Sequence, residues 1–324
     1  MVMQAVTMTT PGGPEAMTLS PLELAAPGAG QVRLRHTAIG LNFIDTYHRS
    51  GLYPLPLPTG LGIEAAGVVE AVGDGVAGLA VGQRIAYCWG PPGAYATHRL
   101  IDAARVVALP DEVSDEVAAA AFLKGCTVEF LVERCARVQA GQWALVHAAA
   151  GGVGLLLVQW LKHLGAHVIA MAGTVEKVAR AVAAGADHGL VQGPGFAAEV
   201  RALTGGRGVD VVFDGIGRDT FEASLDSLRK RGLFVSYGNA SGPVGEIDYG
   251  ILARKGSLFA TRPTLFDYYA RRDELVHHGG QVLHMLATGA LTVSIGQRYA
   301  LADVAQAHRD LEARRTTGST VLLP

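Results

Sequence analysis

The sequence has few of the residues that build metal lobes and disulfide frameworks. Its 324 residues include three cysteines, Cys88, Cys126 and Cys135, and no two of them form a C-x-x-C pair. Three scattered cysteines argue against a disulfide framework and favour a reducing compartment, so we expect a cytoplasmic protein. The N-terminus lacks a basic segment followed by an apolar run, and we therefore expect no signal peptide.

Charge is also scarce. Charged residues make up 17% of the chain, the formal net charge is −2, and hydrophobic residues make up 49%. This balance is typical of a compact enzyme and gives no reason to expect nucleic acid or a membrane as a partner. The apolar run 144–161 is interrupted by glycines, and a buried strand that continues into a buried helix explains it better than a membrane span. The basic stretch 229–231 is expected to be a solvated helix end.

The distribution of apolar residues changes near residue 115. Before it, short apolar strands separated by glycine and proline predict a mostly β domain. After it, apolar strands alternate with helical segments, including one expected over 221–232. This alternation predicts an α/β fold with a doubly wound, parallel, six-stranded sheet. The six strands are expected at 142–148, 166–172, 188–192, 209–217, 232–238 and 256–262.

The stretch HAAAGGVG (147–154) lies between the first of these strands and a helix over 152–164. It resembles the dinucleotide-binding turn G-x-G-x-x-G, but Ala149 replaces the first glycine. We expect Gly151 to let the backbone approach a pyrophosphate, and Gly154 to let the helix pack on the strand. The N–H groups of Gly152 and Val153 would then face the ligand from the positive helix end. The methyl group of Ala149 is tolerated if its φ is negative.

The end of the second strand distinguishes NADP from NAD. An NAD site places Asp or Glu there to bind the ribose. This chain has Ala172, Gly173 and Thr174 instead, followed by Lys177 in the first turn of the next helix. A lysine attracts a 2′-phosphate, which predicts NADPH. The alternative is that Lys177 is an ordinary surface lysine.

Motifs along the whole chain resemble those of the medium-chain dehydrogenase/reductase superfamily, and most closely its zinc-free quinone oxidoreductases, the ζ-crystallin-like group. This resemblance implies a GroES-like β domain formed by residues 1–122 and 263–324, with a Rossmann NADPH-binding domain over 123–262. The motifs that carry it lie at 40–54, 62–73, 147–154, 236–242 and 258–263.

Zinc members of the superfamily carry a histidine before the glutamate of a GHE stretch, and this chain has Ile63 before Glu64. The cysteine ligand of those members is also missing from residues 42–45, and only Cys88 lies where the structural zinc lobe needs four cysteines. We therefore expect no metal site.

The resemblance also implies the site residues. Asn42, Asp45, Tyr47 and Tyr53 are the candidate catalytic residues, with the two tyrosines lining the acceptor pocket or merely packing. Gln192 stands where close relatives often carry a tyrosine beside the adenosine phosphate. The implied cofactor-binding residues are Asn42, Phe43, Ile44, Asp45, Tyr47, Phe130, Gly151, Gly152, Val153, Gly173, Thr174, Lys177, Gln192, Ile216, Gly238, Asn239, Ala240, Ser241, Pro263, Thr264, Leu265 and Arg314.

The expected function is reduction of a small-molecule quinone by NADPH. Two alternatives remain open, an NADPH-dependent enone (double-bond) reductase and a non-catalytic NADPH-binding protein. The resemblance further implies a homodimer joined through the Rossmann domain.

Overall fold

The computed structural model describes residues 2–324, and the chain divides into two compact units. Unit 1 combines the N-terminal part up to Cys126 with Tyr269–Pro324, and unit 2 is Thr127–Tyr268. The expected boundaries, 122/123 and 262/263, lie a few residues earlier. Residues 123–126 stay with unit 1, where Gly125 packs against Val282. Residues 263–268 stay with unit 2, where Tyr268 stacks on Phe130 with ring centroids 4.6 Å apart.

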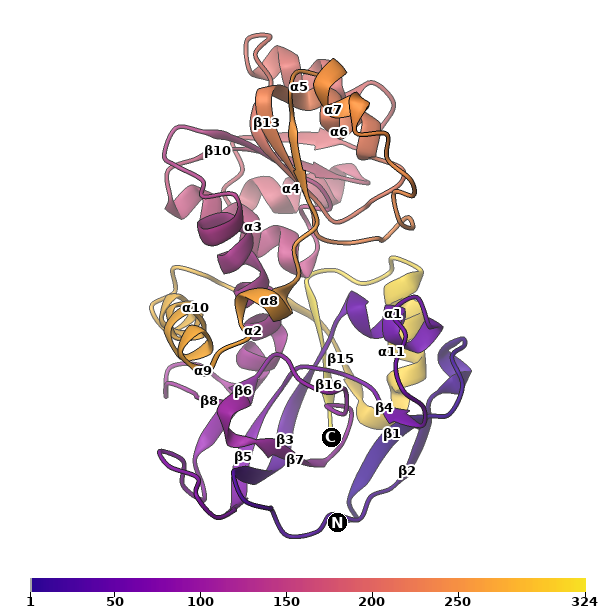
Figure 1. Ribbon diagram of the computed structural model, residues 1–324, viewed down its shortest axis with the longest axis vertical. Helices are drawn as coiled ribbons and strands as arrows, with labels where there is room; N and C mark the ends of the chain where they lie inside the picture. Colours follow the sequence, from indigo (N-terminus) through magenta and orange to yellow (C-terminus); the bar gives the residue numbers. More distant parts are fainter. Residues whose placement is uncertain (1) are drawn as a thin grey trace. The chain divides into compact units, whose positions relative to one another are not determined.

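Unit 2 is built around one sheet of six strands in the order β11-β10-β9-β12-β13-β14. Figure 1 labels β10 and β13 of this sheet. All neighbouring strands are parallel, and the order reverses direction between β9 and β12. This is the doubly wound sheet that the sequence predicts. Its strands are β9 (Trp143–Val146), β10 (His167–Ala172), β11 (His188–Val191), β12 (Val209–Asp214), β13 (Leu228–Ser236) and β14 (Phe259–Thr261).

Helices connect these strands, as parallel neighbours require. The apolar run 144–161 is divided between β9 and α3, as expected from its glycines. The helices of unit 2 are η3 (Phe130–Cys135), α3 (Gly152–His163), α4 (Val175–Ala183), α5 (Phe196–Leu203), α6 (Phe221–Ser227), α7 (Gly250–Arg254) and α8 (Leu265–Tyr268).

The helix expected over 221–232 is wrong in its second half. Helix α6 ends at Ser227, and Leu228 pairs with Val209 as the first residue of β13. Residues 229–231 therefore lie on a strand and not at a helix end. Sheet pairing prevails over the helical spacing because Leu228 is completely buried there.

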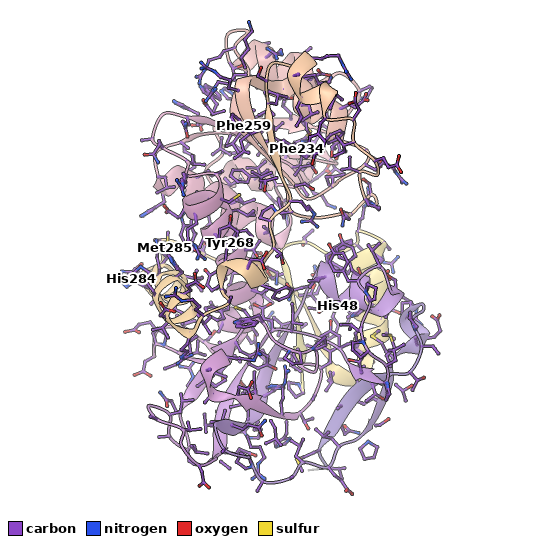
Figure 2. The ribbon with its side chains drawn as sticks, viewed as in Figure 1. His48, Phe234, Phe259, Tyr268, His284 and Met285 are labelled. Atoms are coloured by element: carbon purple, nitrogen blue, oxygen red, sulfur yellow. The ribbon has the colours of Figure 1, made fainter. Side chains whose placement is uncertain are left out.

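The hydrophobic core of unit 2 is formed by side chains of the sheet and of the helices that cover it, and it includes β13. Phe234 on β13 is 2% exposed, and its ring centroid lies 5.4 Å from that of Phe221. Phe259 on the edge strand β14 is 61% exposed. Figure 2 labels Phe234 and Phe259. The first lies in the buried part of the sheet and the second on its exposed edge.

Unit 1 contains a three-stranded sheet, β2-β1-β4, and a larger sheet in which β3 is central. The larger sheet has the order β15-β16-β3-β5-β6-β8, and β7 also pairs with β3. The C-terminal β16 pairs with β3, which unites the two ends of the chain in one sheet. The strands are β1 (Gln4–Met8), β2 (Thr18–Pro21), β3 (Gln31–Leu41), β4 (Thr59–Gly60), β5 (Ala65–Val72), β6 (Arg84–Tyr87), β7 (His98–Asp102), β8 (Val107–Ala108), β15 (Ile295–Ala300) and β16 (Ser319–Leu323).

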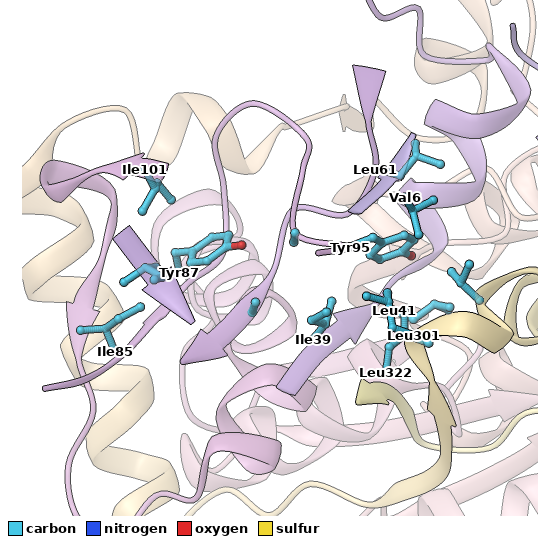
Figure 3. Packing of buried hydrophobic residues seen from close by; sticks show 14 of the residues in the cluster. Val6, Ile39, Leu41, Leu61, Ile85, Tyr87, Tyr95, Ile101, Leu301 and Leu322 are labelled. Atoms are coloured by element: carbon cyan, nitrogen blue, oxygen red, sulfur yellow. The ribbon is translucent and has the colours of Figure 1, made fainter. Parts of the chain in front are cut away.

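The hydrophobic core of unit 1 contains residues from both the N-terminal and the C-terminal part of the chain. Tyr95 is fully buried in it, in one cluster with Leu41 of β3, Leu301, and Leu322 of β16 (Figure 3). The alternating burial of β3 confirms a sheet with one face on the core.

Unit 1 contains one α-helix that the sequence does not predict. Residues 43–50 form α1, although no helical period is evident before residue 114. An eight-residue helix is too short to show a clear period, and Asn42 and Gly51 define its ends. Among residues 2–324, no helix is both long and apolar enough to cross a membrane. The helices of unit 1 are η1 (Pro14–Ala16), α1 (Phe43–Ser50), η2 (Ala103–Arg105), α2 (Asp115–Glu129, which continues into unit 2), α9 (Arg272–Glu274), η4 (Leu275–Gly279), α10 (Gly280–Ala287), η5 (Leu301–Asp303) and α11 (Val304–Glu312).

Candidate active site and cofactor site

The glycine-rich turn joins β9 to α3 and brings the helix unusually close to the strand. A Cβ atom on Gly154 would lie 2.3 Å from the carbonyl oxygen of Ala148 and 2.7 Å from Cα of Ala149. Only glycine fits there, as the sequence predicts. The left-handed residue of the turn is Ala148, with φ 49°, and not Ala149. Such a conformation costs an alanine about 1–2 kcal/mol.

Gly151 has a different surrounding from Gly154. It precedes α3 with φ −77° and ψ 170°, which any residue adopts. A Cβ atom there would meet only Ala148 O, at 3.2 Å, and Gly151 is exposed. The N-terminus of α3 is thus open to a ligand beside Gly151, and its free N–H groups are suited to a phosphate.

The other predicted cofactor residues of unit 2, apart from Phe130, follow the carboxyl ends of the remaining strands. This edge of a parallel sheet is where ligands bind. These residues are Gly173, Thr174 and Lys177 after β10, Gln192 after β11, Ile216 after β12, Gly238, Asn239, Ala240 and Ser241 after β13, and Pro263, Thr264 and Leu265 after β14.

A buried aspartate organises two of these loops. Asp214 is fully buried, and its Oδ1 accepts hydrogen bonds from the N–H groups of Ile216 (2.7 Å) and Gly217 (3.0 Å). The loop at Ser241 is held against the first, because its N–H and its hydroxyl both donate to Ile216 O, at 2.8 and 2.9 Å. The structure thus places Ile216 and Ser241 side by side.

The same aspartate belongs to a buried polar cluster that no sequence motif indicates. Ser224 donates to Asp214 Oδ2 at 3.1 Å, and His147 Nε2 lies 2.9 Å from the Ser224 hydroxyl. All three side chains are fully buried, and burial lowers the pKa of His147. Because no solvent reaches this histidine, we interpret the group as a support for the turn at 147–154.

The residues at the end of β10 form the first turn of α4. Thr174 is the N-cap, and its hydroxyl accepts a hydrogen bond from the N–H of Lys177 at 3.3 Å. Glu176 is in the same turn, fully exposed, and its pKa is lowered by its own N–H and by the hydroxyl of Thr174. The turn therefore carries one cation and one anion, and the anion is bound by the helix end itself.

Phe130 lies at the start of η3, 2% exposed. Tyr268 of α8, labelled in Figure 2, stacks on it, and the guanidinium of Arg134 lies 5.2 Å from the centre of the Tyr268 ring. Tyr268 has no signal in the sequence beyond being aromatic. The stack fixes the segment that follows Pro263–Leu265.

In unit 1, Asn42 connects α1 to a buried ion pair. Its amide Nδ2 donates to Glu64 Oε2 at 2.7 Å, and the N–H of Leu123 donates to Glu64 Oε1 at 2.6 Å. Lys124 Nζ lies 3.6 Å from Glu64 Oε2. Glu64 is fully buried and Lys124 is 6% exposed, so both charges are removed from water. Burial raises the pKa of Glu64, while Lys124 and the donated hydrogen bonds oppose that rise.

Asp45 lies on the inner face of α1 and begins a second set of polar contacts. Its Oδ2 accepts from the N–H of Asn42 (2.9 Å) and from the hydroxyl of Tyr95 (2.8 Å). The Tyr95 oxygen lies 3.1 Å from His308 Nε2, and Arg49 Nη1 lies 3.1 Å from His308 Nδ1. Arg49 also binds Glu312 at 2.6 Å, at the exposed end of the series.

Burial determines the protonation states of Asp45 and His308 in this series. Burial raises the pKa of Asp45 to about 7 and lowers the pKa of His308 to about 3. His308 is therefore neutral, with Nδ1 accepting from Arg49 and Nε2 donating to the Tyr95 oxygen. Because Asp45 is fully buried inside unit 1, we interpret it as a positioning residue for α1.

The outer side of α1 carries an aromatic cluster. The ring centroid of Tyr47 lies 5.1 Å from that of Tyr53 and 5.7 Å from that of Phe43. His48, labelled in Figure 2, lies on the same helix with its ring centroid 6.2 Å from that of Tyr53. Ile44 shares this partly exposed side, which is suited to a flat organic ligand.

Arg314, the last predicted phosphate ligand, lies in unit 1 between α11 and β16. It is exposed and adopts a left-handed conformation with φ 58°. Its role stays a prediction.

The positions that carry zinc ligands in the zinc members of the superfamily do not bring metal-binding side chains together here. Ile63 is 1% exposed and packs as a core residue. Among residues 2–324, no three histidine, cysteine, aspartate or glutamate side chains lie close enough together to hold a metal ion. The Lys124 ammonium lies beside Glu64, 3.6 Å from Oε2.

Glu64, Lys124, Tyr95 and His308 are absent from the predicted site. Glu64 is noticed in the sequence only as the residue after a missing zinc ligand. Tyr95 and His308 are separated by 213 residues, and nothing in either segment indicates the other.

A glycine-rich turn on a doubly wound sheet, joined to a β unit formed by both ends of the chain, defines a two-domain dehydrogenase or reductase. Residues 28–111 match the alcohol dehydrogenase GroES-like domain family, and residues 152–269 match the zinc-binding dehydrogenase family. The chain is 47% identical over 317 residues to a quinone oxidoreductase of Salmonella typhimurium, covering 97% of each protein. It therefore belongs to the quinone oxidoreductase family.

Two further proteins are similar to this chain over nearly its whole length. The crystal structure of Escherichia coli quinone oxidoreductase complexed with NADPH matches with a TM-score of 0.96 at 43% identity, covering 99% of this chain and 100% of that one. A 2-haloacrylate reductase of Burkholderia sp is 43% identical over 336 residues, covering 100% of this chain and 99% of that protein.

Proposed function

We propose that this protein is a zinc-independent NADPH:quinone oxidoreductase. The observation that carries the proposal is the close approach of α3 to β9 at Gly154, beside the open backbone at Gly151. The names of the relatives support quinone as the acceptor, and the E. coli complex supports NADPH. We further propose a cytoplasmic location, in keeping with three free cysteines.

The residues present fit NADPH. Gly151, Gly152 and Val153 would bind the pyrophosphate, and Thr174 with Lys177 would bind the 2′-phosphate. Gly173, Gln192 and Arg314 would complete the adenosine end. The residues proposed to hold the nicotinamide half are Asn42, Phe43, Ile44, Tyr47, Phe130, Ile216, Gly238, Asn239, Ala240, Ser241, Pro263, Thr264 and Leu265.

When bound, NADPH supplies a hydride, and the chain supplies orientation and exclusion of water. Glu64 fixes the amide of Asn42 through the 2.7 Å hydrogen bond. Tyr47 and Tyr53 would form a wall for the acceptor. A reduced quinone spreads its negative charge over an aromatic ring, so its protonation needs no strong general acid.

A double-bond reductase is the second candidate, favoured by the full-length similarity to the 2-haloacrylate reductase. NADPH oxidation measured with 1,4-benzoquinone and with 2-chloroacrylate separates the two. We expect the larger kcat/KM with benzoquinone, unchanged by EDTA, from protein with less than stoichiometric zinc. Activity with 2-chloroacrylate alone would replace our proposal with the second candidate, and activity lost with EDTA would refute zinc independence.

The first prediction concerns the 2′-phosphate. Lys177→Ala should lower kcat/KM for NADPH by roughly 10- to 100-fold, because a charge-assisted hydrogen bond contributes about 1.5–3 kcal/mol. The value for NADH should change little. Arg180→Ala, which removes the same charge one turn further along α4, is the control and should change both values by less than threefold. An equal loss for both cofactors would show that Lys177 does not bind the phosphate.

The second prediction concerns proton transfer. Tyr47→Phe should lower kcat with benzoquinone by less than about tenfold, whereas loss of a general acid typically costs 10²–10⁴-fold. Tyr53→Phe, in the same aromatic cluster, is the matched comparison. A loss above about a hundredfold at Tyr47 alone, with unchanged NADPH affinity, would make Tyr47 an essential acid.

The third prediction concerns assembly. We propose a homodimer that pairs the β14 edges of two copies, since Phe259 is 61% exposed on that edge. Phe259→Lys should convert the dimer to a monomer in analytical ultracentrifugation. Val191→Lys, on the opposite edge strand β11 and 43% exposed before substitution, should not. Dimers of both variants would place the interface elsewhere.

A further inference from the structure

A pocket of about 740 Å³ opens at the amino end of the unit 2 sheet, and it is lined almost entirely by cations. Five arginines, two lysines and two glycines make up its lining. The cations come from the end of α5 and the turn after it, from the start of β13, and from the end of α7 and the residue after it. The predicted cofactor residues lie at the carboxyl ends of the same strands, so this pocket is separate from them.

Three carboxylates account for part of this charge. Asp210 pairs with Arg207 and Arg229, Asp226 pairs with Lys255, and Asp248 pairs with Arg254. Seven cations therefore face three anions. An excess of four positive charges is concentrated here in a chain whose net charge is −2.

Arg201 is fixed without a carboxylate. Its guanidinium donates to three carbonyl oxygens, those of Asp226 (2.8 Å), Gly206 (3.1 Å) and Leu228 (2.9 Å). These bonds hold the group rigidly and leave its charge uncompensated. The end of α5 explains why one cation is favourable there, but it does not explain the remaining ones.

Lys230 and Arg231 have no structural explanation of this kind. Both are exposed at the start of β13, and neither forms an ion pair among residues 2–324. Arg231 also adopts φ 59°, a conformation that favours glycine. Neither residue is at the end of a helix, so the helix dipole does not account for them.

We propose that this pocket binds a small anion that carries two or more phosphate groups. Arginine forms paired hydrogen bonds with carboxylates and with phosphates alike, but an excess of four positive charges matches an anion with several negative charges and not a single carboxylate. The volume is in the range of small-molecule sites. The lining contains no aromatic residue, so it offers no surface on which a base could stack. This disfavours a nucleotide and single-stranded nucleic acid as ligands.

The test is calorimetric titration of inorganic tripolyphosphate into the full-length protein saturated with NADPH, so that the cofactor site does not compete. We expect one site per chain and an affinity that falls steeply with added salt. Lys230→Glu and Arg231→Glu should each weaken binding at least tenfold. Arg309→Glu, at an exposed arginine on α11, changes the net charge equally and should weaken binding less than threefold. Unchanged melting temperatures and KM for NADPH would show that the variants are folded.

Three outcomes would overturn the proposal. The first is that tripolyphosphate shows no binding at millimolar concentration in low salt. The second is that Arg309→Glu weakens binding as much as the β13 variants do, and the third is that orthophosphate binds as tightly as tripolyphosphate. Tighter binding of adenosine triphosphate or of a single-stranded oligonucleotide would assign the pocket to a base-containing ligand. If either β13 variant fails to fold, Arg254→Glu at the end of α7 tests the same pocket, and unaltered binding there would also count against it.

Discussion

Replacing Lys124 with methionine should destabilise unit 1 by about 3–5 kcal/mol, which is the cost of leaving one partner of a buried ion pair alone. Glu64 would keep its hydrogen bonds from Asn42 and from the N–H of Leu123 but lose the cation 3.6 Å away. For a domain of this size, the melting temperature should fall by roughly 10 °C. Differential scanning calorimetry measures the change directly.

The loss should depend on pH in a definite direction. Burial already raises the pKa of Glu64, and removal of Lys124 raises it further. A carboxyl group whose pKa is higher in the folded than in the unfolded state favours folding at pH values below its unfolded pKa. That contribution disappears as the pH rises through the folded pKa. Lys124→Met should therefore be progressively less stable relative to the wild type as the pH rises.

The double variant Glu64→Gln, Lys124→Met separates this interpretation from a packing defect. Without a carboxylate to leave unpaired, it should recover about 2 kcal/mol or more relative to Lys124→Met alone, and its deficit should not grow with pH. A double variant as unstable as the sum of the two single variants would refute the coupling.

The second large effect is expected at the glycine-rich turn. Gly154→Ala would place a methyl group 2.3 Å from Ala148 O and 2.7 Å from Ala149 Cα. Both atoms belong to the backbone and cannot rotate away, so α3 must move from β9. We expect the free energy of unfolding to fall by at least about 3 kcal/mol, because a clash with fixed backbone atoms is more severe than ordinary overpacking. NADPH affinity should fall by at least a hundredfold, measured by fluorescence titration.

Two other glycines provide matched comparisons. Gly151→Ala should melt within about 2 °C of the wild type, because its Cβ would meet only Ala148 O at 3.2 Å. It should nevertheless weaken NADPH binding, since the methyl group would lie on the open side of the turn. Gly280→Ala in α10, with nothing within 4 Å, should preserve both properties. If Gly151→Ala binds NADPH normally, the pyrophosphate does not lie beside Gly151.

The predictions from sequence succeeded where the signal is local. Six apolar strands, each followed by a helix or a glycine turn, were sufficient to predict the doubly wound sheet. The prediction failed at 228–231, where helical spacing continues but Leu228 pairs with β12. It also missed α1, which is defined by Asn42, Gly51 and its burial rather than by a long period.

The candidate site divides in the same way. Gly154 could be identified from sequence because a steric requirement on one residue leaves a single amino acid possible. Lys124 could not, because its significance depends on Glu64, a carboxylate in a distant segment that lies just before β5. Glu64 and Lys124 are each unremarkable in sequence, and only their shared burial makes them a pair.

The sequence by itself therefore determined the sheet, the glycine turn and the absence of an acid after β10, since each depends on neighbouring residues. The tertiary structure alone decided which polar groups lie together. It joined Asp45 to Tyr95 and His308, and it gathered Arg201, Lys230 and Arg254 around one pocket. The physical reason is that burial and charge are properties of a place in the fold, and segments far apart in the chain supply its walls.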